Sequence, residues 1–208
     1  MSVQTDLRTV RPPTRWAWIA ILLLATGVAL ASTRYLADGS MVPPPLKLNF
    51  DAHTLLFRLH IGAASTALLL GPWQFLGALR RARPRLHRAI GVIYVGACAI
   101  GGVAGLLIAP GTNGGPVAAL GFASLACLWL WTTGNAVAAI RRHDIPAHRR
   151  WMTRSFALTL AGVTLRLYLP VALLAPLAFS TAYAAIAWLC WVPNLIIAWR
   201  MTPAPRNA

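Results

Sequence analysis

Six long apolar runs constrain this chain more than any other feature of its sequence. They cover residues 16–33, 55–79, 89–109, 117–140, 155–177 and 182–199. A helix needs about 20 mainly apolar residues to cross roughly 30 Å of hydrocarbon, so each run is long enough to span a bilayer. Backbone groups in lipid must bond internally, and no alternating strand pattern indicates a barrel. The sequence therefore predicts an all-α integral membrane protein, a bundle of six transmembrane helices.

The positive charge of the chain indicates different partners in a membrane protein and in a soluble protein. Only 11% of the 208 residues are charged, against about 25% in soluble domains. A net charge of +15 would favour a nucleic-acid partner in a soluble protein, but here the arginines stand in short clusters between apolar runs. We therefore expect the lipid bilayer and its anionic head groups as partners, and no nucleic acid.

The distribution of basic residues also predicts the orientation of the spans in the membrane. Fifteen of the 19 Lys and Arg residues fall in the two tails and in the connections between spans two and three and spans four and five. Cytoplasmic loops carry such an excess. We expect a membrane protein with a cytoplasmic tail of residues 1–15, a membrane domain of residues 16–200 and a cytoplasmic tail of residues 201–208. The first run also has the features of a cleaved signal peptide, which would leave five spans in the same orientation.

A pattern in the connection between spans two and three recurs 61 positions later. An aliphatic-Arg-Arg start and a His-Arg end stand at the same spacing in residues 79–88 and 140–149. We interpret spans two and three as one helical hairpin, and spans four and five as its copy. The repeat places His87 and His148 at equivalent positions.

Small and polar residues inside the runs bear on how the helices pack. Ala97, Gly101 and Gly105 recur every four residues, a spacing that lets helix backbones approach closely. Three polar residues in the inner halves of spans two, four and six could form one inward-facing cluster: Gln74, Asn135 and Asn194.

The chain resembles a known family through a set of short motifs. They are Leu59-His60-Ile61, Gly71-Pro72-x-Gln74-Phe75, His87-Arg88-x-x-Gly91-x-x-Tyr94, Asp144-x-x-x-His148-Arg149-x-Trp151-Met152-x-Arg154-Ser155, Val163-Thr164-Leu165-Arg166 and Trp191-Val192-Pro193-Asn194-Leu195. As a set they resemble the bacterial predicted-membrane-protein family known as domain of unknown function 2306, over about residues 53–199. The resemblance implies a multi-span membrane protein of bacteria, which we expect in the inner membrane, and it brings no reaction with it.

His87 and His148 are candidate ligands of a b-type haem. Equivalent places in two repeats put them at similar depth on two helices, which is the arrangement that a bis-histidine haem requires. In this the chain resembles the six-span cytochromes of the b561 type, and such a haem could exchange electrons with quinone. The outer end offers only His60 as a further haem ligand, so a second haem lacks a partner. The alternative is that the rings of His87 and His148 bond loop carbonyls at the membrane interface.

Arg166 is the candidate for binding an anion. A guanidinium inside a span costs at least about 2.5 kcal/mol unless it faces a partner or water. We expect compensation from Asp51, from carbonyls that Pro170 or Pro193 frees by kinking its helix, or from an anionic ligand. Three functions therefore stay open: a haem redox protein, a small transporter or lipid-handling protein, and an accessory membrane protein without catalytic activity.

Overall fold

The structure, a computed structural model, describes residues 14–174 and 176–203. Within these residues six helical segments are long and apolar enough to cross a membrane, which confirms the all-α, six-span prediction. Most of the two predicted tails lies outside the described residues. So do Arg8, Arg11 and Arg206, three of the arginines behind the predicted orientation.

Helices and short connecting elements alternate along the chain. The first three spans are α1 (Arg15–Ala37), α3 (Thr54–Gln74) and α5 (Pro84–Ile108), and η2 (Ala109–Gly111) extends α5. Between them lie η1 (Gly39–Met41), α2 (Pro44–Ala52) and α4 (Gly77–Ala82). The fourth span is α6 (Gly115–Arg141), the fifth is α7 (Ile145–Thr159) with α8 (Ala161–Leu174), and the sixth is α9 (Phe179–Leu189) with α10 (Val192–Met201).

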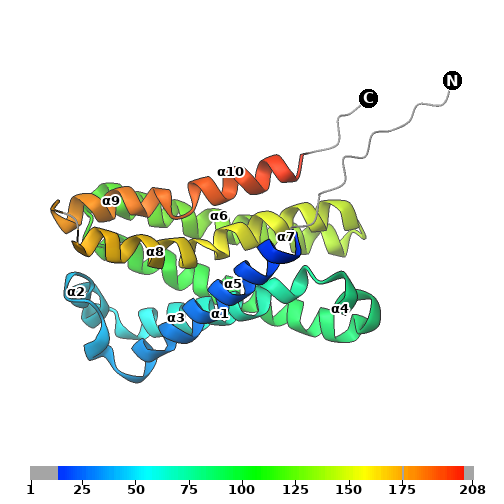
Figure 1. Ribbon diagram of the computed structural model, residues 1–208, viewed down its shortest axis with the longest axis horizontal. Helices are drawn as coiled ribbons and strands as arrows, with labels where there is room; N and C mark the ends of the chain where they lie inside the picture. Colours follow the sequence, from blue (N-terminus) through cyan, green and yellow to red (C-terminus); the bar gives the residue numbers. More distant parts are fainter. Residues whose placement is uncertain (1–13, 175, 204–208) are drawn as a thin grey trace.

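The connections sort to two ends of the bundle. α2 lies at one end, which we call the α2 end, and α4 lies at the opposite end (Figure 1). Asn113, just after η2, donates a hydrogen bond to the carbonyl of Pro45, so η2 belongs to the α2 end. The opposite end, which we call the arginine-rich end, includes α4, the start of α5, the end of α6 and the turn that follows it. Its arginines include Arg80, Arg81, Arg83, Arg141 and Arg142.

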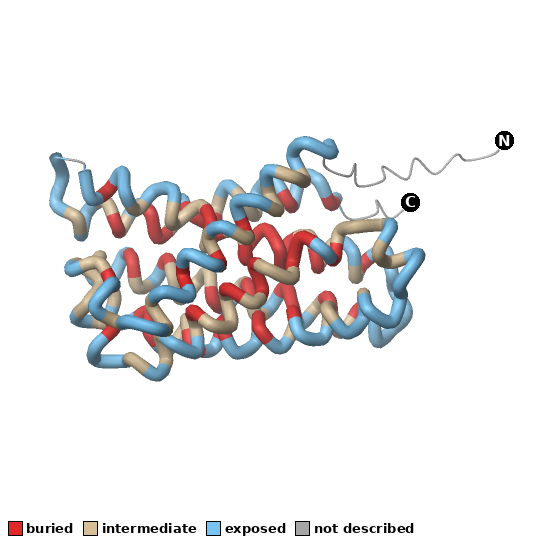
Figure 2. Tube along the Cα trace, turned by 60° about the horizontal axis from the view of Figure 1, so that its bottom comes forward, coloured by how far each residue is buried: buried red, intermediate tan, exposed pale blue. Residues whose placement is uncertain are grey.

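Four spans form the centre of the bundle. α3 packs on α5, α5 on α6, α6 on α7, and α7 contacts α3 again. Each predicted hairpin is thus a pair of adjacent helices. α1 packs outside on α3, and α9 packs on α6 and α8. Figure 2 shows buried positions gathered midway along the bundle and exposed ones along its outer faces, where large apolar side chains such as Leu23, Val92 and Leu174 suit contact with lipid.

The second span is shorter than predicted. The run of residues 55–79 predicted one helix, but α3 ends at Gln74, two residues after Pro72. The next two backbone N–H groups bond carbonyls three residues back rather than four, which tightens the last turn and closes the helix. α4 then begins a separate helix at Gly77.

The fifth span begins earlier than predicted. The apolar run predicts its start at residue 155, with three arginines in the loop before it. α7 instead begins at Ile145, and all three lie on it: Arg149, Arg150 and Arg154.

The break in the fifth span is also displaced from the expected place. Pro170 lies inside α8, whereas the chain breaks at Leu160, between α7 and α8. Thr159 donates a hydrogen bond of 3.1 Å to the carbonyl of Ser155, and such bonding back along a helix tends to bend it. In the sixth span the break directly precedes Pro193, as expected.

Candidate functional site

A cavity of about 240 Å³ extends from α2 to the middle of the bundle. Its walls come from α1, α3, α5, α6, α7, α8 and α9, and α2 covers one end. One water molecule needs on the order of 10–15 Å³, so the cavity has room for a small organic molecule. Most of the lining is apolar, and its main polar side chains are Tyr35, Asn49, His60, Thr112, Arg166 and Tyr183.

Arg166 lines this cavity from α8. Among the described residues its one hydrogen bond runs from Nη1 to the carbonyl of Gly162, one turn back, at 3.3 Å. Asp51, one of the expected alternatives, does not bond this guanidinium and instead accepts a hydrogen bond from Lys47 on α2. Pro170 provides no free carbonyl for the guanidinium of Arg166. Its missing N–H leaves one carbonyl without a helical partner, and that carbonyl belongs to Arg166 itself.

The other described carboxylates are engaged elsewhere. Asp38 accepts hydrogen bonds from the backbone N–H and the hydroxyl of Ser40. Asp144 accepts one from the backbone N–H of Ala147 at the start of α7. Within the described part of the chain, therefore, no carboxylate offsets the guanidinium of Arg166.

His60 reaches the same cavity from α3. Its Nδ1 lies 2.8 Å from the carbonyl oxygen of Gly101 on α5, and because a carbonyl only accepts, this nitrogen carries the proton. In the neutral ring Nε2 is then an acceptor. A Cβ on Gly105 would lie 3.0 Å from Nδ1, so the row of small residues on α5 makes room for the imidazole as well as for helix packing. The charge of Arg166 acts on this ring.

Asn49 adds an acceptor at the α2 end of the cavity. Its Nδ2 donates a hydrogen bond of 3.1 Å to the carbonyl of Ile108, which fixes α2 against the end of α5. Its Oδ1 is buried and has no hydrogen-bond partner among the described residues. The cavity thus offers a cationic donor from α8 and unpaired acceptors from α2 and α3.

His87 and His148 lie together at the arginine-rich end, away from the cavity. Each is the fourth residue of its helix, α5 or α7, which confirms their equivalent placement in the two hairpins. Nδ1 of His148 lies 2.9 Å from the carbonyl oxygen of Ala136, to which it donates. The four predicted site residues therefore fall into two pairs by place: His60 and Arg166 line the cavity, and His87 and His148 lie in the first turns of α5 and α7.

Arg80 on α4 is half-buried beside the second pair. Its positive charge acts on the ring of His87. Burial, followed by the like charges of Arg149 and Arg81, lowers the pKa of Arg80. Positive charge is thus concentrated at this end of the bundle.

The expected inward-facing polar cluster does not form. Asn135 donates to the carbonyl of Trp131 on its own helix, at an exposed position. Asn194 donates to the hydroxyl of Thr164 on α8. Gln74 is buried between α3 and α5, apart from both.

A buried network of hydroxyl groups lies at the centre of the bundle and was not predicted from the sequence. The hydroxyl of Tyr94 lies 2.8 Å from Oγ1 of Thr159 and 3.1 Å from Oγ of Ser155. Ser155 also bonds Thr133, and Nε1 of Trp129 donates to Thr159. The network ties α5, α6 and α7 together. Its one signal in the sequence is that Tyr94 and Ser155 belong to the family motifs.

Arg154 is a buried arginine that the sequence prediction placed in a loop. It is only 5% exposed. Its guanidinium carbon lies 4.7 Å from the ring centre of Trp151 and 3.8 Å from that of Trp199. It also donates to the hydroxyl and the carbonyl of Thr202. These contacts hold the end of α10 on α7.

Comparison with known proteins gives one match. The model of a family described as predicted membrane protein, DUF2306, matches residues 57–202, which is more than half of the chain. The chain belongs to the DUF2306 family. No curated protein and no solved structure matches it.

The DUF2306 region begins inside α3 and reaches the end of α10. It confirms the resemblance that the motifs indicated, and it contains all four predicted site residues. Tyr35 on α1 and Asn49 on α2 lie outside it. In this DUF2306 protein, therefore, the cavity combines walls from the family region with a cover from the segment that precedes it.

Proposed function

We propose that this DUF2306 protein binds an amphipathic small molecule with an anionic head group in the cavity next to α2, and that it acts as a carrier or lipid-handling protein for such compounds. The observation that carries this proposal is Arg166, a guanidinium that lines an apolar cavity without a carboxylate partner among the described residues. A charge in such surroundings is costly unless it is paired. A carboxylate, sulfonate or phosphate would pair with it through charge-assisted hydrogen bonds.

The rest of the lining supports an amphipathic ligand. Apolar side chains of α3, α5 and α6 would surround an alkyl chain, and Asn49 and His60 offer acceptors to hydroxyl groups near the head. A quinone would fit the apolar walls, but its uncharged carbonyls would leave the charge of Arg166 unpaired. We therefore favour an organic anion over a quinone.

We further propose that the protein lies in the bacterial cytoplasmic membrane with the α2 end outside. The concentration of arginines at the opposite end supports this orientation, because basic residues collect on the cytoplasmic side of membrane proteins. A ligand would then enter from the outer leaflet or from the outer aqueous phase.

A matched pair of ligands tests the binding proposal. Protein in nanodiscs is titrated with decanoate and with decanol, which have the same chain length and differ in head-group charge. Decanoate should bind at least about tenfold more tightly, since a hydrogen bond to a charged group contributes about 1.5–3 kcal/mol. Calorimetry gives both affinities, and a short-chain quinone serves as a third ligand.

Two variants sharpen this test. Arg166→Gln should remove the preference for decanoate, and Arg166→Lys should keep part of it. Arg58→Gln is the matched control, because Arg58 is an exposed basic residue on α3. Equal binding of decanoate and decanol, or an Arg166→Gln variant that still prefers decanoate, would refute an anion site in the cavity. Tighter binding of the quinone would favour redox chemistry instead.

A b-type haem held by His87 and His148 is the second candidate. The orientation of His148 favours it, because its Nδ1–H bonds a backbone carbonyl and leaves Nε2 for a metal, as in many histidine sites. The described residues contain no group of three His, Cys, Asp or Glu side chains that could hold a metal ion, but a haem needs only two protein ligands. Protein from haem-replete cells should show a strong absorption band that reductant shifts and His148→Ala weakens. Colourless protein would contradict this candidate.

A further inference from the structure

We infer that the arginine-rich end contains a binding site for a phosphate-class oxyanion, between Gln74 on α3, Arg80 on α4 and the first turns of α5. This site is separate from the cavity next to α2. Three observations support it: buried polar groups without partners among the described residues, a helix start without a capping side chain, and positive charge without a free carboxylate in the neighbouring described residues.

Two buried polar groups at this place have no partner among the described residues. Gln74 is 9% exposed, and its Nε2, which can only donate, is buried without an acceptor. Nδ1 of His87 is buried and unpaired as well. A Cβ on Gly91 would lie 3.2 Å from Oε1 of Gln74, so this amide lies against α5. His87 and Gly91 are four residues apart and share one face of α5, which brings the two unpaired groups to the same face.

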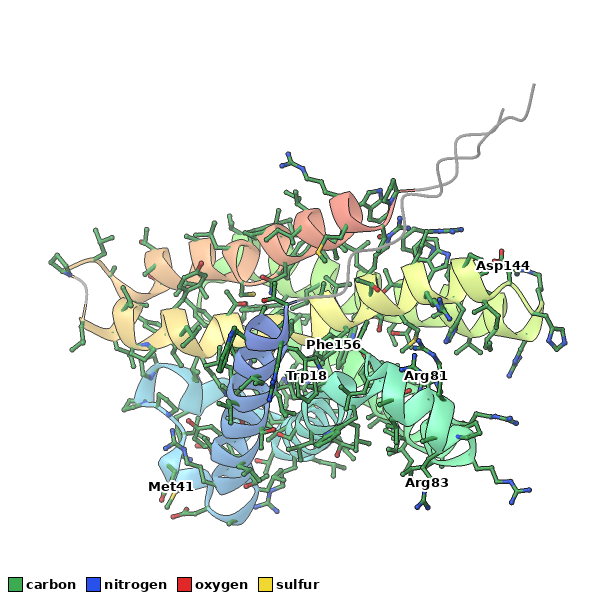
Figure 3. All side chains as sticks on the ribbon, turned by 45° about the vertical axis from the view of Figure 1, so that its right-hand side comes forward. Trp18, Met41, Arg81, Arg83, Asp144 and Phe156 are labelled. Atoms are coloured by element: carbon green, nitrogen blue, oxygen red, sulfur yellow. The ribbon has the colours of Figure 1, made fainter. Side chains whose placement is uncertain are left out.

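The start of α5 lacks the cap that its counterpart has. In the second hairpin Asp144 caps α7 by accepting a hydrogen bond of 2.9 Å from the N–H of Ala147. The equivalent residue in the first hairpin is Arg83, which makes no capping bond, and the first turn of α5 has no acidic residue. Figure 3 shows Arg83 and Asp144 at the same end of the molecule. The start of a helix carries a partial positive charge of about half a unit. At α7 this charge lies next to the carboxylate of Asp144, whereas at α5 it lies next to the cationic Arg83.

Arginine side chains complete the site. The charge of Arg80 acts on His87, and Arg149 on α7 is close enough to act on Arg80. The described carboxylate nearest in sequence to Arg149 is Asp144, which already caps α7. A water molecule could satisfy one of the unpaired groups but not this charge. An oxyanion with several acceptor oxygens can bond an amide N–H, an imidazole and a guanidinium at once.

Two sources could supply this chemistry, free phosphate and the phosphate of a membrane lipid. The first experiment uses inorganic phosphate. Thermal unfolding of detergent-solubilised, delipidated protein is followed while phosphate replaces chloride at constant ionic strength. Phosphate should raise the unfolding temperature of the wild type. Arg80→Gln should weaken the apparent affinity about tenfold, because it removes one charged hydrogen-bond donor. Arg141→Gln, at the equivalent place of the second hairpin, is the matched control and should leave the affinity unchanged.

A second variant supplies the missing carboxylate. Arg83→Asp gives α5 the acid that α7 has, so this variant should be more stable than the wild type without phosphate and should no longer respond to phosphate. It keeps the inference testable even if Arg80→Gln folds poorly. Native mass spectrometry identifies the source: retention of phosphatidylglycerol by the wild type but not by Arg80→Gln indicates a lipid, and a response to inorganic phosphate alone indicates a free ion.

Three results would overturn the inference. One is the absence of both a phosphate response and retained phospholipid in the wild type. Another is an equal loss of affinity in Arg80→Gln and Arg141→Gln. The third is a haem absorption band that His87→Ala abolishes, which would show that iron, not an oxyanion, occupies this end of the bundle.

Discussion

At the scale of single residues, the buried Arg154 and the half-buried Arg166 differ in how their positive charge is compensated. Arg154 is enclosed by two indole rings and bonds Thr202, so its positive charge is stabilised by the protein itself. Arg166 has a single bond to a carbonyl of its own helix and lines a cavity. The first arginine is therefore a structural contact, and the second is available to a ligand.

Replacing Arg154 by lysine should loosen the end of α10. Lysine keeps the charge but loses the planar fork and much of the stacking on the two indoles, at a cost of about 1–3 kcal/mol. Hydrogen exchange of residues 192–201 should become faster in Arg154→Lys. Arg150→Lys, on the same helix, is the control, and equal exchange in the two variants would show that Arg154 does not hold α10.

The candidate site could be predicted only in part. Arg166 stands out in the sequence because a cation inside an apolar run is costly, and it is the one arginine or lysine among the described residues that line the cavity. That His60 meets it there depends on how α3, α5 and α8 pack, which local patterns do not encode. Asn49 and the hydroxyl of Tyr94 were not predicted as functional groups, because polar groups of these types more often form hydrogen bonds within the fold than contacts with a ligand.

At the scale of elements, the two hairpins differ most at their turns. The first contains the short helix α4 and leaves α5 without a capping side chain, whereas the second has a tight turn in which His143 takes a positive φ of 59° and Asp144 caps α7. Apolar runs predicted the existence of each span because length and hydropathy determine it. The ends of the spans depend on caps, on Pro72 and on hydroxyl groups, and there the predictions were off by several residues.

Removing the cap of α7 should destabilise the protein measurably. Asp144→Ala removes the acceptor for the N–H of Ala147, and losses of this kind cost about 1 kcal/mol. Asp51→Ala is the control, since it removes an exposed carboxylate that pairs with Lys47 within one helix, a pair worth roughly 0.3–0.5 kcal/mol. Thermal unfolding in detergent should show the larger loss for Asp144→Ala, and the reverse order would contradict the capping role.

At the scale of the whole molecule, the connections that the sequence assigned to opposite sides of the membrane do lie at opposite ends of the bundle. The α2 end and the arginine-rich end are separated by the length of the spans (Figure 1). Which end faces the cytoplasm is a prediction from the distribution of basic residues.

Reporter fusions determine this orientation. Reporters inserted near Arg83 or Arg150 should read as cytoplasmic, and reporters near Pro44 or Asn113 should read as external. The insertion near Asn113 is the most informative, because Asn113 bonds Pro45 and so belongs to the same end as α2. A cytoplasmic reading there would reverse the orientation proposed for the ligand cavity.

The lining of the cavity also determines when it can be complete during biosynthesis. Ser32 on α1 and Tyr183 on α9 both line it, so the lining extends from the first span to the sixth. While a ribosome has delivered only the first five spans, the part of the lining that α9 supplies is missing. We therefore expect ligand binding to require insertion of the sixth span.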